Sequence, residues 1–447
     1  MVENLFGTDG IRGIANKYPI SCEIALKLGR AVGLLVKKNR HTSIIIGKDT
    51  RKSGDMLESA LLSGIVSTGI NGIIAGVIPT PGVAFLVNDL EDAGAGIVIS
   101  ASHNPYYDNG LKIFNDQGEK LDSMDQDFIE QYIHNNKIFE GSEDIGEIIK
   151  YSDANKKYAE FLRSAIDFKS IKKPIKLLID CSNGAGFNTA PLVFNNKYFN
   201  AEYIFNTPNG ENINENCGSQ HTEVLSEKVK RNGFDLGLGF DGDADRLIAV
   251  DENGNEIKGD KILAICSKYL KEQGELDNNI VVSTVMSNIG FVNFLKNLNI
   301  KHIVSDVGDS NVVKEMKKNN AIIGGEDSGH LIFFNHHTTG DGILSALKLI
   351  EVMAVKRKPL SELAQVMTVY PQVLMNVEVD KSKPDFMAIN EISKQIKHVK
   401  DKLGSEGRVL IRYSGTQPLL RVMIEGPDKK IIENYCRKIC GAIQTYL

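Results

Sequence analysis

The sequence predicts an α/β protein in which three similar α/β segments are followed by a smaller α+β segment. Three observations support this fold class. Short β-branched runs alternate with stretches of helical spacing over most of the chain, which is the pattern of parallel βαβ units. In each of the first three segments, a strand ends in a polar, glycine-rich turn. Beyond residue 367 several strands precede one long helix, which is typical of an α+β domain.

The first segment is expected to cover residues 1–153. A helix is predicted at 24–37, because its apolar residues Ile24, Leu28, Ala31, Val32 and Leu35 share one face. We also expect strands at 43–47, 72–77, 96–99 and 111–114 and a helix at 56–68. The strand at 96–99 runs into Ser100-Ala-Ser-His-Asn-Pro105. Ligands of open α/β folds bind at the carboxyl ends of strands, so we expect this loop to belong to a site.

The second, third and fourth segments are expected at 154–252, 253–367 and 368–447. In the second, a helix at 154–166 and strands at 175–180 and 234–240 lead to an acidic loop that begins at Asp241. In the third, strands at 280–285 and 321–324 lead to a loop that ends at His330. The fourth has predicted strands at 368–379, 408–412 and 419–425 and a helix at 429–446.

Composition narrows the function classes. With 52 Lys and Arg against 57 Asp and Glu, the formal charge of −5 argues against nucleic acid or an anionic membrane as the partner. The first residues lack the basic and apolar regions of a signal peptide, and no apolar run reaches the length of a bilayer span. None of the six cysteines forms a C-x-x-C pair. This cysteine usage predicts a cytoplasmic protein.

The acidic loop contains Asp241, Asp243 and Asp245, which would project to one side of an extended stretch. Three adjacent carboxylates repel one another unless a cation lies among them, and hard oxygen ligands suit Mg²⁺. The same spacing begins a calcium-binding loop, but Arg246 stands where that loop requires glycine. Arg246 instead offers charge-assisted hydrogen bonds to a phosphate.

A second candidate phosphate site lies near the C-terminus. It combines backbone N–H groups beside a glycine with two hydroxyls and two guanidinium groups, from Arg412, Ser414, Gly415, Thr416 and Arg421. These groups suit a phosphate dianion. Together with Ser102 as a candidate nucleophile and the three carboxylates, they predict phosphoryl transfer.

Five motifs, in this order along the chain, resemble the signature loops of the α-D-phosphohexomutase family: 6–13, 100–105, 241–246, 324–330 and 412–421. The resemblance covers nearly the whole chain. It implies three α/β domains and a smaller C-terminal domain around a central cleft. It also implies a phosphate carried on Ser102, which with the three aspartates would hold one Mg²⁺. Catalytic roles are implied for Arg12, His103, Lys112 and Arg246.

The activity implied by the resemblance is interconversion of glucosamine 6-phosphate and glucosamine 1-phosphate through a 1,6-bisphosphate. A bisphosphate would serve as primer, and the product would supply UDP-N-acetylglucosamine for cell-wall synthesis. A homodimer is expected. The alternative is the same mechanism on glucose or mannose phosphate, but 338–342 and 419–426 look more like the glucosamine branch. Intact Ser102 argues against a non-catalytic sugar-phosphate sensor and against a phosphatase with an aspartate nucleophile.

Several roles stay open at this point. Glu326, Ser328 and His330 resemble a sugar-recognition loop, although His330 could equally be structural. Lys112 could act as a general acid or base if desolvation lowers its pKa, or could only neutralise phosphate charge. The basic residues Lys48 and Arg51 are expected to be structural or peripheral. The chain departs from the family pattern at Ser310, Asp327 and Gln417, where Arg, Gln and Glu are usual.

Overall fold

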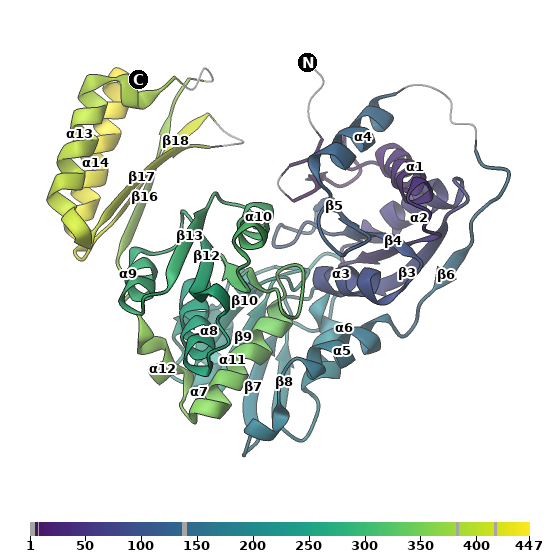
Figure 1. The fold of residues 1–447 in the computed structure, drawn as a ribbon, viewed down its shortest axis with the longest axis horizontal. Coiled ribbons are helices and arrows are strands. Elements are labelled where there is room, and N and C mark those ends of the chain that lie inside the picture. Colours follow the sequence, from purple (N-terminus) through teal and green to yellow (C-terminus); the bar gives the residue numbers. More distant parts are fainter. Residues whose placement is uncertain (1–4, 8, 136–140, 381–383, 415–417) are drawn as a thin grey trace. The chain divides into compact units, whose positions relative to one another are not determined.

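The computed structural model describes residues 5–7, 9–135, 141–380, 384–414 and 418–447 (Figure 1). Its contacts divide the chain into two compact units. One contains Met1–Met286 and Asn299–Val366, and the other contains Ser287–Leu298 and Met367–Leu447. No helix within the described ranges is long and apolar enough to cross a membrane.

The first sheet of the larger unit has six strands in the order β1-β5-β4-β2-β3-β6. Their bounds are β1 Ile11–Ile14, β2 Ser43–Lys48, β3 Asn71–Val77, β4 Ala93–Ile99, β5 Asp108–Asn115 and β6 Ile148–Lys150. The helices are α1 Cys22–Lys38, α2 Gly54–Val66, α3 Thr80–Asp89 and α4 Ser123–His134. β2 is parallel to both β3 and β4. The carboxyl ends of β2 and β4 therefore meet at one edge of the sheet.

The second sheet has five strands in the order β11-β10-β9-β7-β8. Their bounds are β7 Ile175–Asp180, β8 Phe199–Ile204, β9 Leu236–Phe240, β10 Leu247–Asp251 and β11 Glu256–Ile257, with helices α5 Ala154–Ser164, α6 Gly186–Phe194 and α7 Glu223–Asn232. β7 is parallel to β8 and β9. Every residue of β9 is buried, as expected for a central strand that delivers a loop to a site.

The third sheet has four strands in the order β13-β12-β14-β15. Their bounds are β12 Ile280–Thr284, β13 Lys301–Ser305, β14 Ile323–Gly325 and β15 Leu331–Phe333, with helices α8 Gly259–Gln273, α10 Asp309–Asn319, α11 Gly342–Lys356 and α12 Leu360–Leu363. The intervening helix α9, Ile289–Asn297, belongs to the second unit, although it lies between β12 and β13 in the chain.

The second unit is built on a three-stranded antiparallel sheet in the order β16-β18-β17. The strands are β16 Gln372–Glu378, β17 Arg408–Tyr413 and β18 Leu419–Glu425, and α13 Asn390–Leu403 and α14 Lys429–Tyr446 lie on one face of the sheet (Figure 1). Helix α9 is attached at the end of β18, where the N–H of Ile289 donates to Glu425 Oε2 at 3.2 Å.

The three α/β sheets and the smaller α+β part confirm the predicted fold class. The strands at 175–180 and 419–425 and the helix at 429–446 coincide with their predicted bounds. The strand expected at 111–114 is β5, but its antiparallel direction and the antiparallel return strands after the second and third loops were not predicted. β4–β5, β9–β10 and β14–β15 are antiparallel neighbours, and the loops singled out in the sequence are the connections between them. In the fourth segment, where the α+β form was expected, the predicted strands at 408–412 and 419–425 are antiparallel neighbours, β17 and β18.

Candidate active site

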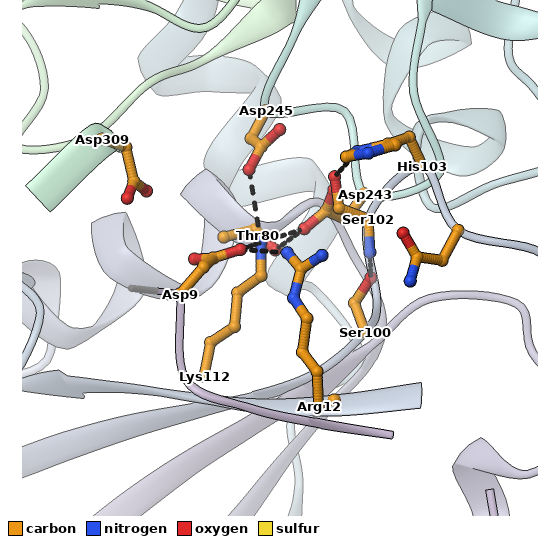
Figure 2. A network of polar contacts seen from close by, with 12 residues as sticks. Asp9, Arg12, Thr80, Ser100, Ser102, His103, Lys112, Asp243, Asp245 and Asp309 are labelled. Atoms are coloured by element: carbon orange, nitrogen blue, oxygen red, sulfur yellow. Dashed lines mark hydrogen bonds and ion pairs between the residues drawn. The ribbon is translucent and has the colours of Figure 1, made fainter. Parts of the chain in front are cut away.

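Ser102 lies in the loop between β4 and β5, where the buried apolar strand β4 gives way to polar residues. Its side chain points at the acidic loop, with Oγ donating to Asp241 Oδ2 at 2.6 Å. The Nδ1 atom of His103 lies 3.2 Å from the same Oγ, and the Ser102 N–H donates to Ser100 Oγ at 3.0 Å (Figure 2). The residue is 1% exposed and its φ is +52°. The serine is therefore held in a specific, uncommon backbone conformation.

The acidic loop between β9 and β10 brings three buried carboxylates together. Asp241, Asp243 and Asp245 each place one oxygen within 4.8 Å of the others. The extended stretch expected from the sequence is wrong, because the chain turns back here. Ala244 has φ +54° and its N–H donates to Asp241 O at 3.0 Å. The reversal is required by the antiparallel pairing of β9 with β10, and it, rather than alternation, makes the carboxylates converge.

The carboxylate cluster fits a divalent metal ion. Asp243 Oδ1 and Asp245 Oδ1 are buried and have no hydrogen-bond partner among the described residues, which is costly for a carboxylate out of water. Burial, followed by the negative charges of Asp245 and Asp243, holds the pKa of Asp241 well above its usual range. A hard cation among these oxygens would relieve both problems.

Lys112, on β5, is the cation that faces this cluster. Its Nζ lies 2.8 Å from Asp243 Oδ2, 3.3 Å from Asp245 Oδ2 and 3.1 Å from Asp9 Oδ2, and the side chain is buried. Burial alone would lower the pKa of Lys112, but Asp243, Asp9 and Asp245 outweigh it and place that pKa well above the usual value. Lys112 therefore lacks the lowered pKa that a general base needs as long as these carboxylates face it.

Asp243 is held from two sides. Thr80, at the start of α3, donates its hydroxyl to Asp243 Oδ2 and its N–H to Asp243 O at 3.0 Å. Burial raises the pKa of Asp243, but the charge of Lys112 and the hydrogen bonds from Lys112 and Thr80 outweigh it, so that this pKa falls to about 2. This carboxylate is therefore ionised at neutral pH.

A chain of ion pairs continues from Lys112 toward the third sheet. Asp9 pairs with Arg12 and with Lys120, and Lys120 also pairs with Asp309 at the start of α10. Burial raises the pKa of Asp9, but Lys112, Lys120 and Arg12 outweigh it and hold that pKa well below its usual range. The network thus links two of the α/β segments through alternating charges.

Arg246 and His103 lie on the other side of the carboxylates. The Nε atom of Arg246 is 3.9 Å from Asp241 Oδ2 and 3.8 Å from Asp245 Oδ1, and it has no hydrogen bond to the described residues. Burial, then the charges of Arg246 and Arg12, lowers the pKa of His103 to about 4. The imidazole is therefore neutral near pH 7, and the Nδ1–H tautomer satisfies its contact with Ser102.

The third loop, between β14 and β15, arranges its polar groups around Glu326. Ser328 Oγ donates to Glu326 Oε2 at 3.2 Å, and the Gly308 N–H donates to Oε1 at 3.1 Å. His330 is 3% exposed, and neither ring nitrogen has a hydrogen-bond partner among the described residues, although Nε2 is 3.8 Å from Asp309 Oδ2. These groups are available for a ligand's hydroxyls.

The structure also places two departures from the family pattern. Asp327 turns to the start of α8, where its Oδ1 accepts from the Asp260 N–H at 3.3 Å. The helix dipole favours a carboxylate there, but burial outweighs it and the Asp260 hydrogen bond and raises the pKa of Asp327. Ser310 lies in the first turn of α10, and its N–H donates to Asp309 Oδ1 at 2.7 Å. The third departure, Gln417, lies outside the described residues.

The candidate phosphate loop belongs to the second unit. Arg412 and Arg421 are direct cross-strand partners on β17 and β18. Ser414 is buried, and its N–H donates to Leu419 O at 2.8 Å. Gly415 and Thr416 lie outside the described residues. Two like charges opposite each other in a sheet repel, and an anion bound between them would offset that repulsion.

Within the larger unit, the structure gathers Ser102, His103, Arg12, Lys112, Arg246 and the three aspartates. Sequence reasoning assigned no role to Asp9, Thr80, Lys120 or Asp309. Asp9 carried a signal because it lies within the motif at 6–13, and Asp309 carried one because it directly precedes Ser310, where the chain departs from the family pattern. Thr80 and Lys120 are recognisable only by their partners in space.

Comparison with known proteins places this geometry in context. Models of the phosphoglucomutase/phosphomannomutase alpha/beta/alpha domains I, II and III match residues 3–139, 156–254 and 258–370, and the model of the C-terminal domain matches 374–442. A protein of Desulforapulum autotrophicum, named phosphoglucosamine mutase, is 56% identical over 98% of both chains. A protein of the same name from Syntrophus aciditrophicus is 48% identical over 99% of both chains.

Solved structures share the fold at low sequence identity. A phosphoglucomutase/phosphomannomutase family protein of Burkholderia thailandensis superposes with a TM-score of 0.82 at 21% identity, covering 100% of this chain and 98% of that one. The N-acetylphosphoglucosamine mutase of Aspergillus fumigatus, solved with GlcNAc-6P and magnesium, gives a TM-score of 0.68 at 16% identity, covering 99% and 95%.

Proposed function

The chain belongs to the phosphoglucomutase/phosphomannomutase family, and on that premise we propose that it interconverts glucosamine 6-phosphate and glucosamine 1-phosphate. The observation that carries the chemistry is the hydrogen bond from Ser102 Oγ to the buried carboxylate cluster. The identity of 56% to a phosphoglucosamine mutase, over nearly the full length of both chains, supports the hexosamine as substrate.

The reaction runs through a phosphoserine. Phospho-Ser102 gives its phosphoryl group to the free hydroxyl of the sugar phosphate, so that the Oγ–P bond breaks and a sugar O–P bond forms. The proton of that hydroxyl passes to a base of the site. The 1,6-bisphosphate then turns round, and Ser102 Oγ takes the other phosphoryl group. That sugar O–P bond breaks, the Oγ–P bond re-forms, and the base returns the proton to the sugar oxygen that is released. Positioning and charge stabilisation dominate such transfers. We assign these roles to Arg12, Lys112 and Arg246, whose cationic groups pair with Asp9, Asp243 and Asp241 of the same site.

We assign one Mg²⁺ to Asp241, Asp243 and Asp245, completed by an oxygen of phospho-Ser102. The buried oxygens without hydrogen-bond partners, described above, support this assignment. When bound, the ion supplies positive charge that stabilises the transferring phosphoryl group. We also propose glucosamine 1,6-bisphosphate, or a similar bisphosphate, as the primer that first phosphorylates the serine.

Substrate recognition is assigned to the other two loops. Glu326 and Ser328, which are hydrogen-bonded to each other, would bind sugar hydroxyls together with His330. Arg412, Ser414, Gly415, Thr416 and Arg421 would bind the phosphate that does not react. The two arginines opposite each other on β17 and β18 support an anion site.

The segment bounds 1–153, 154–252, 253–367 and 368–447 stay proposals, as do the cytoplasmic location and the homodimer. The six cysteines are free thiols, which is consistent with a reducing compartment.

The test is turnover by the purified protein. With Mg²⁺ and a bisphosphate primer, the protein should convert glucosamine 6-phosphate into glucosamine 1-phosphate. Phosphorus NMR measures this conversion. Ser102→Ala serves as the control for contaminating mutase. A higher kcat/KM on glucose or mannose 6-phosphate would establish the alternative substrate. No turnover of any hexose phosphate would refute the assignment of an enzyme.

A further inference from the structure

The backbone of Ser102 lies in the left-handed region, with φ +52°. L side chains adopt this region only when their surroundings hold it, and such residues gather at functional sites. A phosphoryl carrier must keep its Oγ aimed at the same place through two transfers. The groups that hold the Ser102 peptide should therefore act on both transfers.

One of them is Arg51, which sequence reasoning had expected to be structural or peripheral. It follows β2, at the sheet edge where the carboxyl ends of β2 and β4 meet. Its Nη2 donates to Ser102 O at 2.9 Å and to Asn104 O at 2.8 Å. Its Nη1 donates to Asp108 O at 3.0 Å and to Pro105 O. One buried guanidinium thus binds four carbonyls, three in the loop between β4 and β5 that carries Ser102 and one at the first residue of β5.

Asp49 keeps that guanidinium in place. Its Oδ2 accepts from Arg51 Nε at 2.8 Å, and its Oδ1 accepts from the Arg51 N–H at 2.9 Å. Oδ2 also accepts from Ser100 Oγ at 2.6 Å, and Ser100 Oγ in turn accepts the Ser102 N–H. The N–H of Ser102 is therefore connected through Ser100 to Asp49, and the carbonyl of Ser102 is bound by Arg51, so both groups depend on the same buried ion pair.

The second group comes from another α/β segment. Asn214, in the connection that follows β8, donates its Nδ2 to Ser102 O at 2.9 Å and to Asn104 O at 3.0 Å. These are the two carbonyls that Arg51 Nη2 also binds. The acidic loop packs against the same point, because a Cβ added to Gly242 would meet Ser102 O at 2.5 Å and Asn214 Nδ2 at 2.8 Å.

We propose that Arg51 and Asn214 are positioning residues that clamp the carbonyls of Ser102 and Asn104 and thereby aim Ser102 Oγ at the acidic loop. The inference rests on the proposed function. Without the clamp the peptide relaxes toward ordinary φ values, and Oγ turns away from Asp241. Since a displacement of about 1 Å can cost about a hundredfold in rate, the clamp should act on kcat rather than on sugar binding.

Asn214→Gly tests the clamp, because glycine retains the left-handed backbone of Asn214 (φ +58°) and removes only the amide. Asn216→Gly is a matched control. Asn216 lies two residues on, has φ +52° and an exposed side chain. We expect kcat to fall about ten- to a hundredfold in Asn214→Gly, with KM within twofold of the control and equal melting temperatures. Equal kcat in the two variants would overturn the proposal, as would a fall in kcat matched by a fall in melting temperature.

Arg51→Lys is the second variant. It leaves a cation beside Asp49 but cannot reproduce the fork that reaches several carbonyls at once. We expect a larger fall in kcat than for Asn214→Gly, with folding checked by circular dichroism. Wild-type kcat in folded Arg51→Lys would exclude Arg51 from the clamp.

Crystal structures of Asn214→Gly and Asn216→Gly separate the clamp from the proposed function. They report φ of Ser102 whether or not glucosamine phosphate is turned over. A shift of Ser102 out of the left-handed region in Asn214→Gly alone would support the clamp even if the substrate assignment failed. An unchanged Ser102 in both, together with equal kcat, would refute the clamp while leaving the function intact.

Discussion

Replacing Lys120 with methionine should destabilise the larger unit at neutral pH. Lys120 pairs with Asp9 and Asp309, and methionine is an unbranched side chain one atom shorter that removes the charge. Loss of one partner of a buried ion pair costs about 3–5 kcal/mol. The Lys120 side chain keeps 19% of its surface exposed, and Asp9 keeps its contacts with Lys112 and Arg12. We therefore expect a loss at or below the lower end of that range, about 2–3 kcal/mol in the free energy of unfolding.

The pH dependence of this destabilisation shows whether it comes from the lost ion pair with Asp309. Burial raises the pKa of Asp309, but Lys120 outweighs it and lowers that pKa in the folded state. In the wild type, this lowered pKa stabilises the fold above the unfolded pKa of Asp, about 3.9, and that stability is lost as the pH falls. In Lys120→Met the pKa of Asp309 should rise. The difference in stability between wild type and variant should then be largest near pH 7 and shrink as Asp309 becomes protonated.

Urea unfolding at pH 7 and near pH 4 measures both effects. Lys317→Met is the matched control, because Lys317 on α10 pairs with Glu119, the neighbour of Lys120 in the chain. The Lys317 side chain is 47% exposed, so this pair should contribute at most about 1 kcal/mol. Equal destabilisation by the two substitutions, or a loss for Lys120→Met that does not change with pH, would refute the reasoning.

Three further predictions concern the proposed reaction. Ser102→Ala should abolish mutase turnover and leave the fold intact, and mass spectrometry of the wild type should show phosphate on Ser102; robust turnover by the variant would refute the mechanism. Chelation should stop catalysis and Mg²⁺ restore it, and Asp243→Asn should weaken Mg²⁺ binding measured by calorimetry, since an amide is a poorer ligand than a carboxylate; full activity in metal-free buffer would count against the assignment. Arg421→Ala should lose about 1.5–3 kcal/mol of transition-state binding energy, which corresponds to a fall of about ten- to a hundredfold in kcat/KM. Most of that fall should come from a raised KM. An unchanged KM with a collapsed kcat would instead place Arg421 at the transferring phosphoryl group.

The parts of the fold that depend on neighbouring residues were predictable. The strands β7 and β9 and the helix α14 can be recognised from the spacing of their own apolar residues. Each candidate loop begins where such an apolar run ends. The return strands β5, β10 and β15 were not recognised as antiparallel, because a strand's spacing carries no information on the direction of its partner. The turn at Ala244 follows from that pairing and was missed with it.

By itself, the sequence determined the fold class, the order of the loops and the residue types that can carry a phosphoryl group or bind a cation, because these follow from local pattern and side-chain chemistry. Only the tertiary structure decided which of those groups meet. Arg51 holds the serine loop, and Thr80 holds Asp243 from 163 positions away in the chain. The sign of the pKa shift at Lys112 was decided in the same way. Burial lowers that pKa and three carboxylates raise it, and since both effects depend on distances in space, spacing along the chain cannot say which is larger.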